Sequence, residues 1–167
     1  MPDPVGQYQN SSDAPVLTVG GEAEVRREWR QGWMLGVNYS YQHSQYVGVG
    51  ADALRRVPNS PEHLASLRGA MPIIGRALML STRFSFESFR YDSNEDGASP
   101  DPQGHTDNAF LWDIVFSGQE QRAGLRYALG LYNALDWRYS VPVASYFAVR
   151  SVPQNGRTLL LQVGVNY

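Results

Sequence analysis

The side chains best suited to hold an ion lie in an acidic stretch, 92–97, which reads DSNEDG. Asp92, Asn94 and Asp96 fit the first half of a calcium-binding loop, in which alternate oxygen-bearing side chains coordinate the ion. Such a loop normally ends on a bidentate glutamate, and this chain has Gln103 at that place. Two interpretations stay open: a Ca²⁺ site within residues 92–103, or a solvated loop without an ion. The sequence implies no other cofactor.

Catalytic chemistry finds little support in the sequence. The histidines His43, His63 and His105 are far apart along the chain, and there is no G-x-S-x-G motif. A Ser/His hydrolase pair stays open as an alternative, but we expect no catalytic residues and no enzyme. The chain has no cysteine, which excludes disulfides and thiolate metal sites, and its net charge of −2 does not favour a nucleic-acid partner.

A second set of chemically capable residues consists of charges spaced two apart. In an extended strand, alternate residues share one face. The first strand places four charges on one face, and later strands add five more to it: Glu22, Glu24, Arg26, Glu28, Arg68, Arg83, Glu87, Asp113 and Arg126. We predict that this face lines a wet lumen and contacts a plug or a passing ligand. The alternative is that cross-strand charge pairs only keep the strands in register.

These charges need long strands to position them, and the chain supplies seven alternating segments. Their ranges are 16–29, 33–46, 62–71, 76–91, 108–117, 122–132 and 156–167. In the last of them Leu159, Leu161 and Val163 alternate with polar neighbours such as Gln162. About ten residues is the length that a tilted strand needs to cross a bilayer. Residues 1–15 read as an outer loop or strand stub, and residues 16–167 as one barrel segment.

The connections between these segments alternate short and long, with long loops at 47–61, 92–107 and 133–155. Outer-membrane barrels have short periplasmic turns and longer outer loops. The sequence therefore predicts an all-β, antiparallel up-and-down transmembrane β-barrel of about 7–8 strands, either a partial barrel or a small closed one. Aromatic residues of the outer segments would contact ligand or pack in an interfacial girdle. They are Tyr91, Trp137, Tyr139, Tyr146 and Phe147.

Three motifs in this order resemble those of TonB-dependent outer-membrane receptors. Residues 56–65 (RVPNSPEHLA) are similar to the loop-to-strand signature of that family. Residues 132–139 (YNALDWRY) are similar to its NLFD..Y element, with Ala134-Leu135 where Leu-Phe is commoner. Residues 152–158 (VPQNGRT), followed by the last strand, resemble the end of the family's sequences.

The resemblance implies a fold and a function. Receptors of this family form a barrel of about 22 strands around a plug, and a short box binds the energy-coupling protein TonB. The chain shows neither plug nor box, so it would be the last third of such a barrel in the outer membrane of a Gram-negative bacterium. Its partners would be membrane lipid, the barrel assembly machinery, the missing strands and plug, and TonB through the full receptor. The ligand would be iron–siderophore, cobalamin or carbohydrate.

Two other architectures stay open. In one, Val5 to Tyr8 helps to form an eighth strand of a small closed barrel, which acts as an adhesin, a structural anchor or a lipid-modifying protein. In the other, the chain is a soluble barrel whose apolar face surrounds a hydrophobic ligand. All three architectures share the same alternation of side chains, so they differ in what covers the apolar face.

Overall fold

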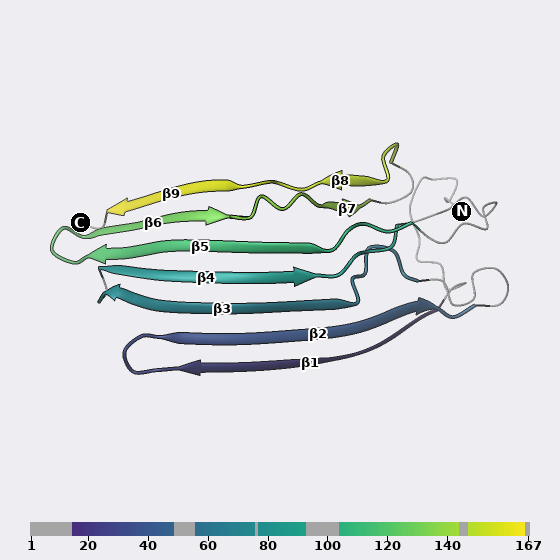
Figure 1. Cartoon of the computed structure of the whole chain (residues 1–167), viewed down its shortest axis with the longest axis horizontal. Helices are drawn as coiled ribbons and strands as arrows, with labels where there is room; N and C mark the ends of the chain where they lie inside the picture. Colours follow the sequence, from purple (N-terminus) through teal and green to yellow (C-terminus); the bar gives the residue numbers. More distant parts are fainter. Residues whose placement is uncertain (1–14, 49–55, 76, 93–103, 144–146, 166–167) are drawn as a thin grey trace, which may run out of the picture.

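The computed structural model describes residues 15–48, 56–75, 77–92, 104–143 and 147–165. These residues form a main sheet and a small hairpin (Figure 1). The strands of the main sheet are β1 (Val16–Glu28), β2 (Met34–Tyr46), β3 (His63–Ile74), β4 (Leu78–Glu87), β5 (Ala109–Glu120), β6 (Leu125–Tyr132) and β9 (Thr158–Val165), and the hairpin consists of β7 (Ser140–Pro142) and β8 (Ser151–Pro153). No helix in the described part of the chain could cross a membrane.

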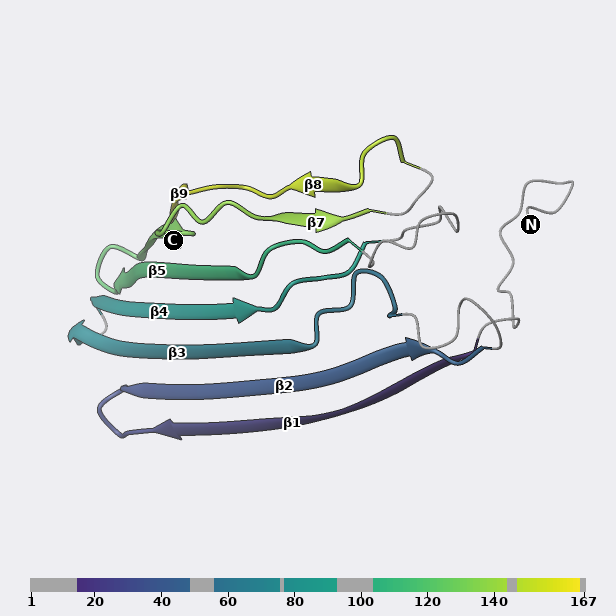
Figure 2. The ribbon, with the colours of Figure 1, turned by 45° about the vertical axis from the view of Figure 1, so that its right-hand side comes forward.

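The main sheet has seven strands in the order β1-β2-β3-β4-β5-β6-β9, and every neighbouring pair is antiparallel. Figure 1 shows the short turns at one end of the sheet and the long connections at the other. In Figure 2, β9 points along the line of sight while β1 to β3 still run across the view, so the sheet twists along its strand order. The predicted all-β, up-and-down architecture is confirmed.

Several predicted strand ends are wrong. Strand β3 continues to Ile74, through the predicted turn at 72–75, because a register shift between Pro72 and Ile74 accommodates a proline that cannot donate to the ladder. Strand β5 runs past Gly118 to Glu120, and the true turn ends at Gly124, whose φ of 60° favours glycine. Of the predicted outer loop 1–15, only Pro15 lies within the described residues.

The hairpin of β7 and β8 lies inside a segment that the sequence assigns to a loop. Val141 pairs with Val152, and the flanking pairs are Ser140 with Pro153 and Pro142 with Ser151. Each strand is only 3 residues long, which is too short for alternation to show. The hairpin nevertheless shapes the long-loop end of the sheet, where the last strand enters.

Cross-strand pairing confirms the predicted division into two faces. On the apolar face, one row of partners runs from β1 to β5 as Val25, Val37, Leu67, Phe84 and Trp112. On the polar face, the next row runs as Arg26, Gly36, Arg68, Arg83 and Asp113. Because register keeps like residues together from strand to strand, each face is chemically uniform over several strands.

Burial on the two faces is the reverse of that in a soluble sheet. In β2 the apolar residues Leu35 and Val37 are exposed, whereas Gly36 between them is buried. In β5 Trp112 is exposed and its neighbour Asp113 is buried. Ala109 is the one buried hydrophobic residue among those described. The described part of the chain therefore has no apolar core, and its apolar face needs a cover, as the lipid-facing side of a membrane barrel has.

The two edge strands have no second partner within the described residues. Strand β1 pairs with β2, and β9 pairs with β6, but β1 and β9 do not pair with each other. An open edge is not tolerated in the hydrocarbon region, because its backbone groups would lack hydrogen bonds. The described residues thus form an open sheet with two free edges, which has the topology of part of a barrel.

Charge on the two faces of β9 should have opposite effects. Leu161 is on the apolar face, and Gln162 is on the polar face opposite Ala128. An arginine facing lipid at mid-membrane costs about 2–4 kcal/mol. In the barrel that contains this chain, Leu161→Arg should sharply reduce the assembled form on a heat-modifiability gel, whereas Gln162→Arg should leave it nearly unchanged. Spin labels give an independent measurement: a label at 161 should respond to a lipid-dissolved relaxant, and one at 162 to a water-soluble relaxant. The opposite pattern would contradict the membrane assignment.

Candidate functional site

The polar face carries ion pairs that cross between strands. Arg68 of β3 reaches over β2 and pairs with Glu24 of β1. It can do so because Gly36 lies between them: a side chain there would begin 3.1 Å from Arg68 Nε. Arg26 pairs with Glu28 along the exposed edge strand β1. The predicted polar residues are therefore partly engaged with one another, in agreement with the charge-pairing interpretation.

Three other predicted residues of this face differ in how they are held. Glu22 is exposed and its carboxylate accepts a long, 3.5 Å hydrogen bond from Ser40. Arg126 is exposed and forms no ion pair with any described residue. Glu87 lies at the long-loop end of β4, where Arg90 binds it at 2.5 Å. Arg126 is the strongest candidate of the three for contact with a partner, because its charge is not neutralised.

Asp113 is a buried charged residue on the polar face, so its carboxylate needs hydrogen-bond donors. Its Oδ2 accepts hydrogen bonds from Arg83 Nη2 at 2.8 Å and Nε at 3.3 Å, and its Oδ1 accepts one from the backbone N–H of Asn133 at 3.0 Å. Asp113 is only 9% exposed. A buried carboxylate with three donors is well compensated. It connects β4, β5 and the exit of β6.

The motif 132–139 is a backbone junction. Asn133 adopts a φ of 49°, and its amide donates to the carbonyls of Trp137 at 3.0 Å and Asn155 at 3.3 Å. Its Oδ1 accepts the N–H of Trp137 at 2.9 Å. Asp136 accepts the N–H of Arg157 at 2.9 Å, immediately before β9 begins. These bonds explain the Asn and Asp of the motif: they connect the end of β6 to the start of β9.

The motif 56–65 makes a similar junction at the start of β3. Asn59 has a φ of 56°, and its side chain accepts a 2.7 Å hydrogen bond from Arg90. The buried Ser88 hydroxyl accepts the N–H groups of Glu62 and His63, both at 3.0 Å. The segment that enters β3 is thus bound to the segment that leaves β4.

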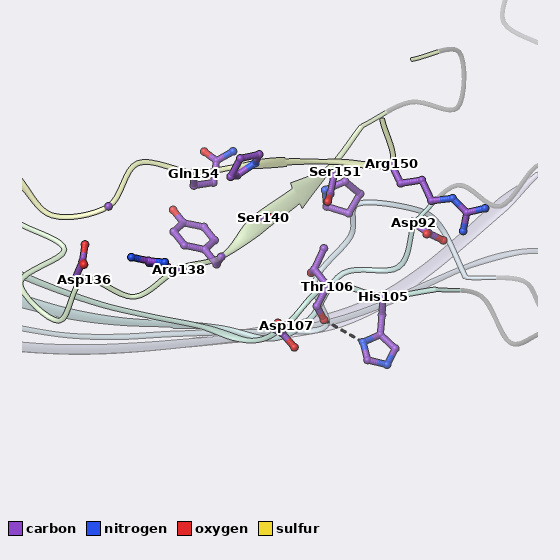
Figure 3. A pocket seen from close by; sticks show the side chains of 14 residues that line it. Asp92, His105, Thr106, Asp107, Asp136, Arg138, Ser140, Arg150, Ser151 and Gln154 are labelled. Carbon is purple, nitrogen blue, oxygen red and sulfur yellow. Dashed lines mark hydrogen bonds between the residues drawn. The ribbon is translucent and has the colours of Figure 1, made fainter. Parts of the chain in front are cut away.

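A cavity of about 600 Å³ lies at the long-loop end of the sheet, beneath the β7–β8 hairpin (Figure 3). The side chains that could bind a ligand come from three segments. They are Arg138, Tyr139, Arg150, Gln154, His105 and Asp107. Arg138 and Arg150 form no ion pair with any described residue. Asp92 and Asp136 line the cavity as well, so it offers cationic and neutral donors together with carboxylate acceptors.

The sequence did not predict most of this cavity. Among the predicted aromatic residues, only Tyr139 lines it. Burial raises the pKa of the Tyr139 hydroxyl above its ordinary value, and the carboxylate of Glu87 raises it further against a smaller opposite effect of Arg90. The phenol therefore keeps its proton and stays a donor well beyond neutral pH. No sequence motif or periodic pattern marks Arg138 and Arg150 as a pair, because only the β7–β8 hairpin brings them to the same cavity.

The other predicted aromatic residues have different positions. Trp137 packs edge-on against Phe110 at 5.0 Å, and its indole donates to the carbonyl of Asn108 at 3.0 Å, which fits girdle packing. Tyr91 packs against Phe89 at 5.4 Å. Phe147 is 54% exposed. Tyr146 lies outside the described residues.

The predicted calcium site stays a prediction. The backbone N–H of Asp92 donates to Gly104 at 2.9 Å, which closes the base of the loop. Asn94, Asp96 and Gln103 lie outside the described residues. Within the described part of the chain, no three acidic or histidine side chains are grouped to hold a metal. His63, for example, bonds Tyr39 at 2.8 Å, on the apolar face.

Comparison with known proteins identifies the fold. No protein-family model matches the chain, and no curated protein matches it. Two solved structures match over 90% of the chain: the ferric citrate transporter FecA in its unliganded form, with a TM-score of 0.75 and 19% identity, and FpvA of P. aeruginosa bound to a pyoverdine–Fe complex, with a TM-score of 0.70 and 17% identity. The chain spans 24% and 19% of those two chains. The described sheet thus has the fold of part of such a barrel.

Loss of the Asp113 carboxylate should destabilise the barrel. Asp113→Ala leaves the Arg83 guanidinium and the Asn133 N–H without their acceptor, and should lower the free energy of unfolding by about 1–3 kcal/mol. Asp113→Asn keeps one acceptor and should cost less. The urea midpoint of the barrel in detergent micelles measures this difference. Arg122→Gln, a change in the exposed β5–β6 turn at a residue that forms no ion pair with a described residue, is the control, with an expected effect below about 0.5 kcal/mol. Equal midpoints for Asp113→Ala and the wild type would refute the role.

Proposed function

We propose that this chain is a barrel segment of a TonB-dependent outer-membrane receptor that takes up a ferric chelate. The observation that carries the proposal is the exposed apolar face of a sheet with two open edges, together with burial of polar-face positions such as Gly36 and Asp113 beside exposed apolar neighbours. A sheet of this kind is stable only within a larger, closed barrel that contacts lipid. The likeness to two such barrels and the three sequence motifs support the same assignment.

The ligand class rests on the cavity under the β7–β8 hairpin. Ferric chelates present carboxylate, hydroxamate or catecholate oxygens around the metal, and often carry negative charge. Arg138 and Arg150 supply cations without a carboxylate in ion-pair distance among the described residues, and Tyr139 supplies a protonated hydroxyl. The carboxylates of Asp92, Asp107 and Asp136 also line the cavity, so the ligand class rests on the two arginines and the Tyr139 hydroxyl, which favour iron–siderophore over neutral carbohydrate. FecA is a ferric citrate transporter and FpvA binds pyoverdine–Fe, which points to the same class.

The location and partners follow from this proposal. The receptor lies in the outer membrane of a Gram-negative bacterium, with the short turns in the periplasm and the long connections outside. The barrel assembly machinery inserts it, and the missing strands and plug complete it. TonB acts on the full receptor. The small closed barrel and the soluble barrel are less well supported, because the described edges do not meet and the apolar face is the exposed one.

Uptake of iron tests the ligand class. Cells that depend on the receptor containing this chain should take up radioactive iron as a ferric chelate, and loss of the receptor should abolish this. Replacing both cavity arginines (Arg138→Gln with Arg150→Gln) should reduce uptake at limiting chelate by about tenfold or more, because two charge-assisted hydrogen bonds are lost. Arg122→Gln, in the turn at the opposite end of the sheet, is the control. Wild-type uptake by the double variant would reject the cavity as the ligand site.

Single cysteines test the orientation. The chain has no cysteine of its own, so an introduced thiol reports on one place. Val149→Cys, in the 54% exposed segment between β7 and β8, should react with a membrane-impermeant maleimide on intact cells. Gln121→Cys, in the β5–β6 turn, should react only after the outer membrane is opened. If the two sites exchange behaviour, the proposed orientation is wrong.

A further inference from the structure

The apolar face contains a groove at the short-turn end of β1 to β4. It has a volume of about 270 Å³. Its walls are Trp29, Trp33, Leu35, Gly69, Met71 and Leu80. Trp29, Trp33 and Leu35 are each at least 40% exposed, so the groove is open to whatever surrounds the barrel. A smooth barrel wall would not need such a depression.

Gly69 produces the groove. In its row across the sheet, Gly69 lies between Leu35 of β2 and Thr82 of β4, and it adds no side chain between them. A Cβ atom at Gly69 would meet the Thr82 methyl at 3.8 Å, so Thr82 turns its methyl toward the groove. The Thr82 hydroxyl is already bonded, to the Trp112 indole at 2.8 Å and the Asp113 carbonyl at 3.1 Å. The base of the groove therefore presents hydrocarbon.

A cation without a counter-ion borders the groove. Arg27 is on the apolar face and pairs in register with Leu35. Its guanidinium lies 5.1 Å from the centre of the Trp29 ring, so the indole orients it. No described carboxylate is within ion-pair distance of Arg27. An uncompensated charge on a lipid-facing surface is costly, and an anion from the membrane would neutralise it.

We propose that this groove binds one acyl chain of an anionic glycerophospholipid, and that Arg27 binds its phosphate. The apolar base over Gly69 fits a hydrocarbon tail, and the cation beside Trp29 fits a headgroup at the membrane boundary. An aromatic pair at the same level, Trp29 and Trp33, is typical of that boundary. The proposal rests on the proposed function only in that the apolar face contacts lipid; it does not depend on the iron ligand.

Lipid retention by the purified receptor tests the site. The receptor in detergent is mixed with phosphatidylglycerol or phosphatidylcholine of the same acyl chains, and bound lipid is counted by native mass spectrometry. The wild type should retain one phosphatidylglycerol in preference to phosphatidylcholine. Gly69→Leu should weaken retention about tenfold, because the leucine occupies the place of roughly two methylene groups. Arg27→Gln should reduce the preference for phosphatidylglycerol about fivefold.

Gly21→Leu is the matched control. It adds the same side chain to the same face near the middle of β1, away from the groove, where nothing lies within 4 Å of a Cβ atom, and lipid retention should not change. Equal retention by Gly69→Leu and the wild type would overturn the groove, and equal retention of the two lipids by the wild type would overturn the role of Arg27. The lipid-retention test contains no ferric chelate, so its result does not depend on iron uptake. Failure of the lipid proposal and failure of the proposed function can therefore be distinguished.

Tryptophan fluorescence provides a second measurement that does not require Gly69→Leu to fold. Two of the four tryptophans of this chain, Trp29 and Trp33, line the groove, and the fluorescence that the receptor loses with Trp29→Phe and Trp33→Phe reports on them. Phosphatidylglycerol with brominated acyl chains should quench this part of the wild-type fluorescence at lower lipid concentration than brominated phosphatidylcholine, by about fivefold. Equal quenching by the two lipids, or none by either, would contradict the proposal.

Discussion

The structure depends on one constraint: none of the described residues covers the apolar face of the sheet. In a soluble protein, burial of apolar side chains provides most of the stability. Here residues such as Val25, Leu159 and Leu161 are about 70% exposed, and the one buried hydrophobic residue described is Ala109. The free energy of this sheet therefore comes from backbone pairing and from its surroundings. In the proposed receptor, lipid on one side and a completed barrel around the lumen supply what a core supplies in a soluble protein.

Hydrogen bonds on the polar side fix the arrangement of the strands, which in a soluble protein is fixed largely by packing in the core. Asp113 shows how: it binds Arg83 on the neighbouring strand and the backbone of Asn133 beyond β6. Asn133 in turn holds Trp137 and Asn155, so the entry of β9 is fixed by the same network. Hydrogen bonds thus connect the Asp113 carboxylate on the polar face to the long-loop end of the sheet. The segments that lead into and out of the β7–β8 hairpin, which covers the cavity, are part of this network.

The two ends of the sheet are specialised in different ways. At the long-loop end, the hairpin and the segments beside it collect cations and hydroxyl groups around a cavity of about 600 Å³. At the short-turn end, a missing side chain at Gly69 and an unpaired Arg27 make an apolar groove with one charge. The first suits an oxygen-rich ligand from outside, and the second suits a lipid. Between them the wall is chemically uniform, because the register carries like residues across each row.

The sequence alone determined the strands, their two faces and the alternation of short and long connections. These are local properties, since alternation with a period of two and turn composition act over a few neighbouring residues. It also pointed to Asn133 and Asp136 through their motif, but not to their hydrogen bonds. Only the tertiary structure decided which charges pair, where β3 and β5 end, that β7 and β8 form a hairpin, and that Arg138 and Arg150 share a cavity. These features arise from contacts between strands that are distant in the chain. The side chains involved give no periodic signal, so their meeting follows from register and folding of the whole sheet.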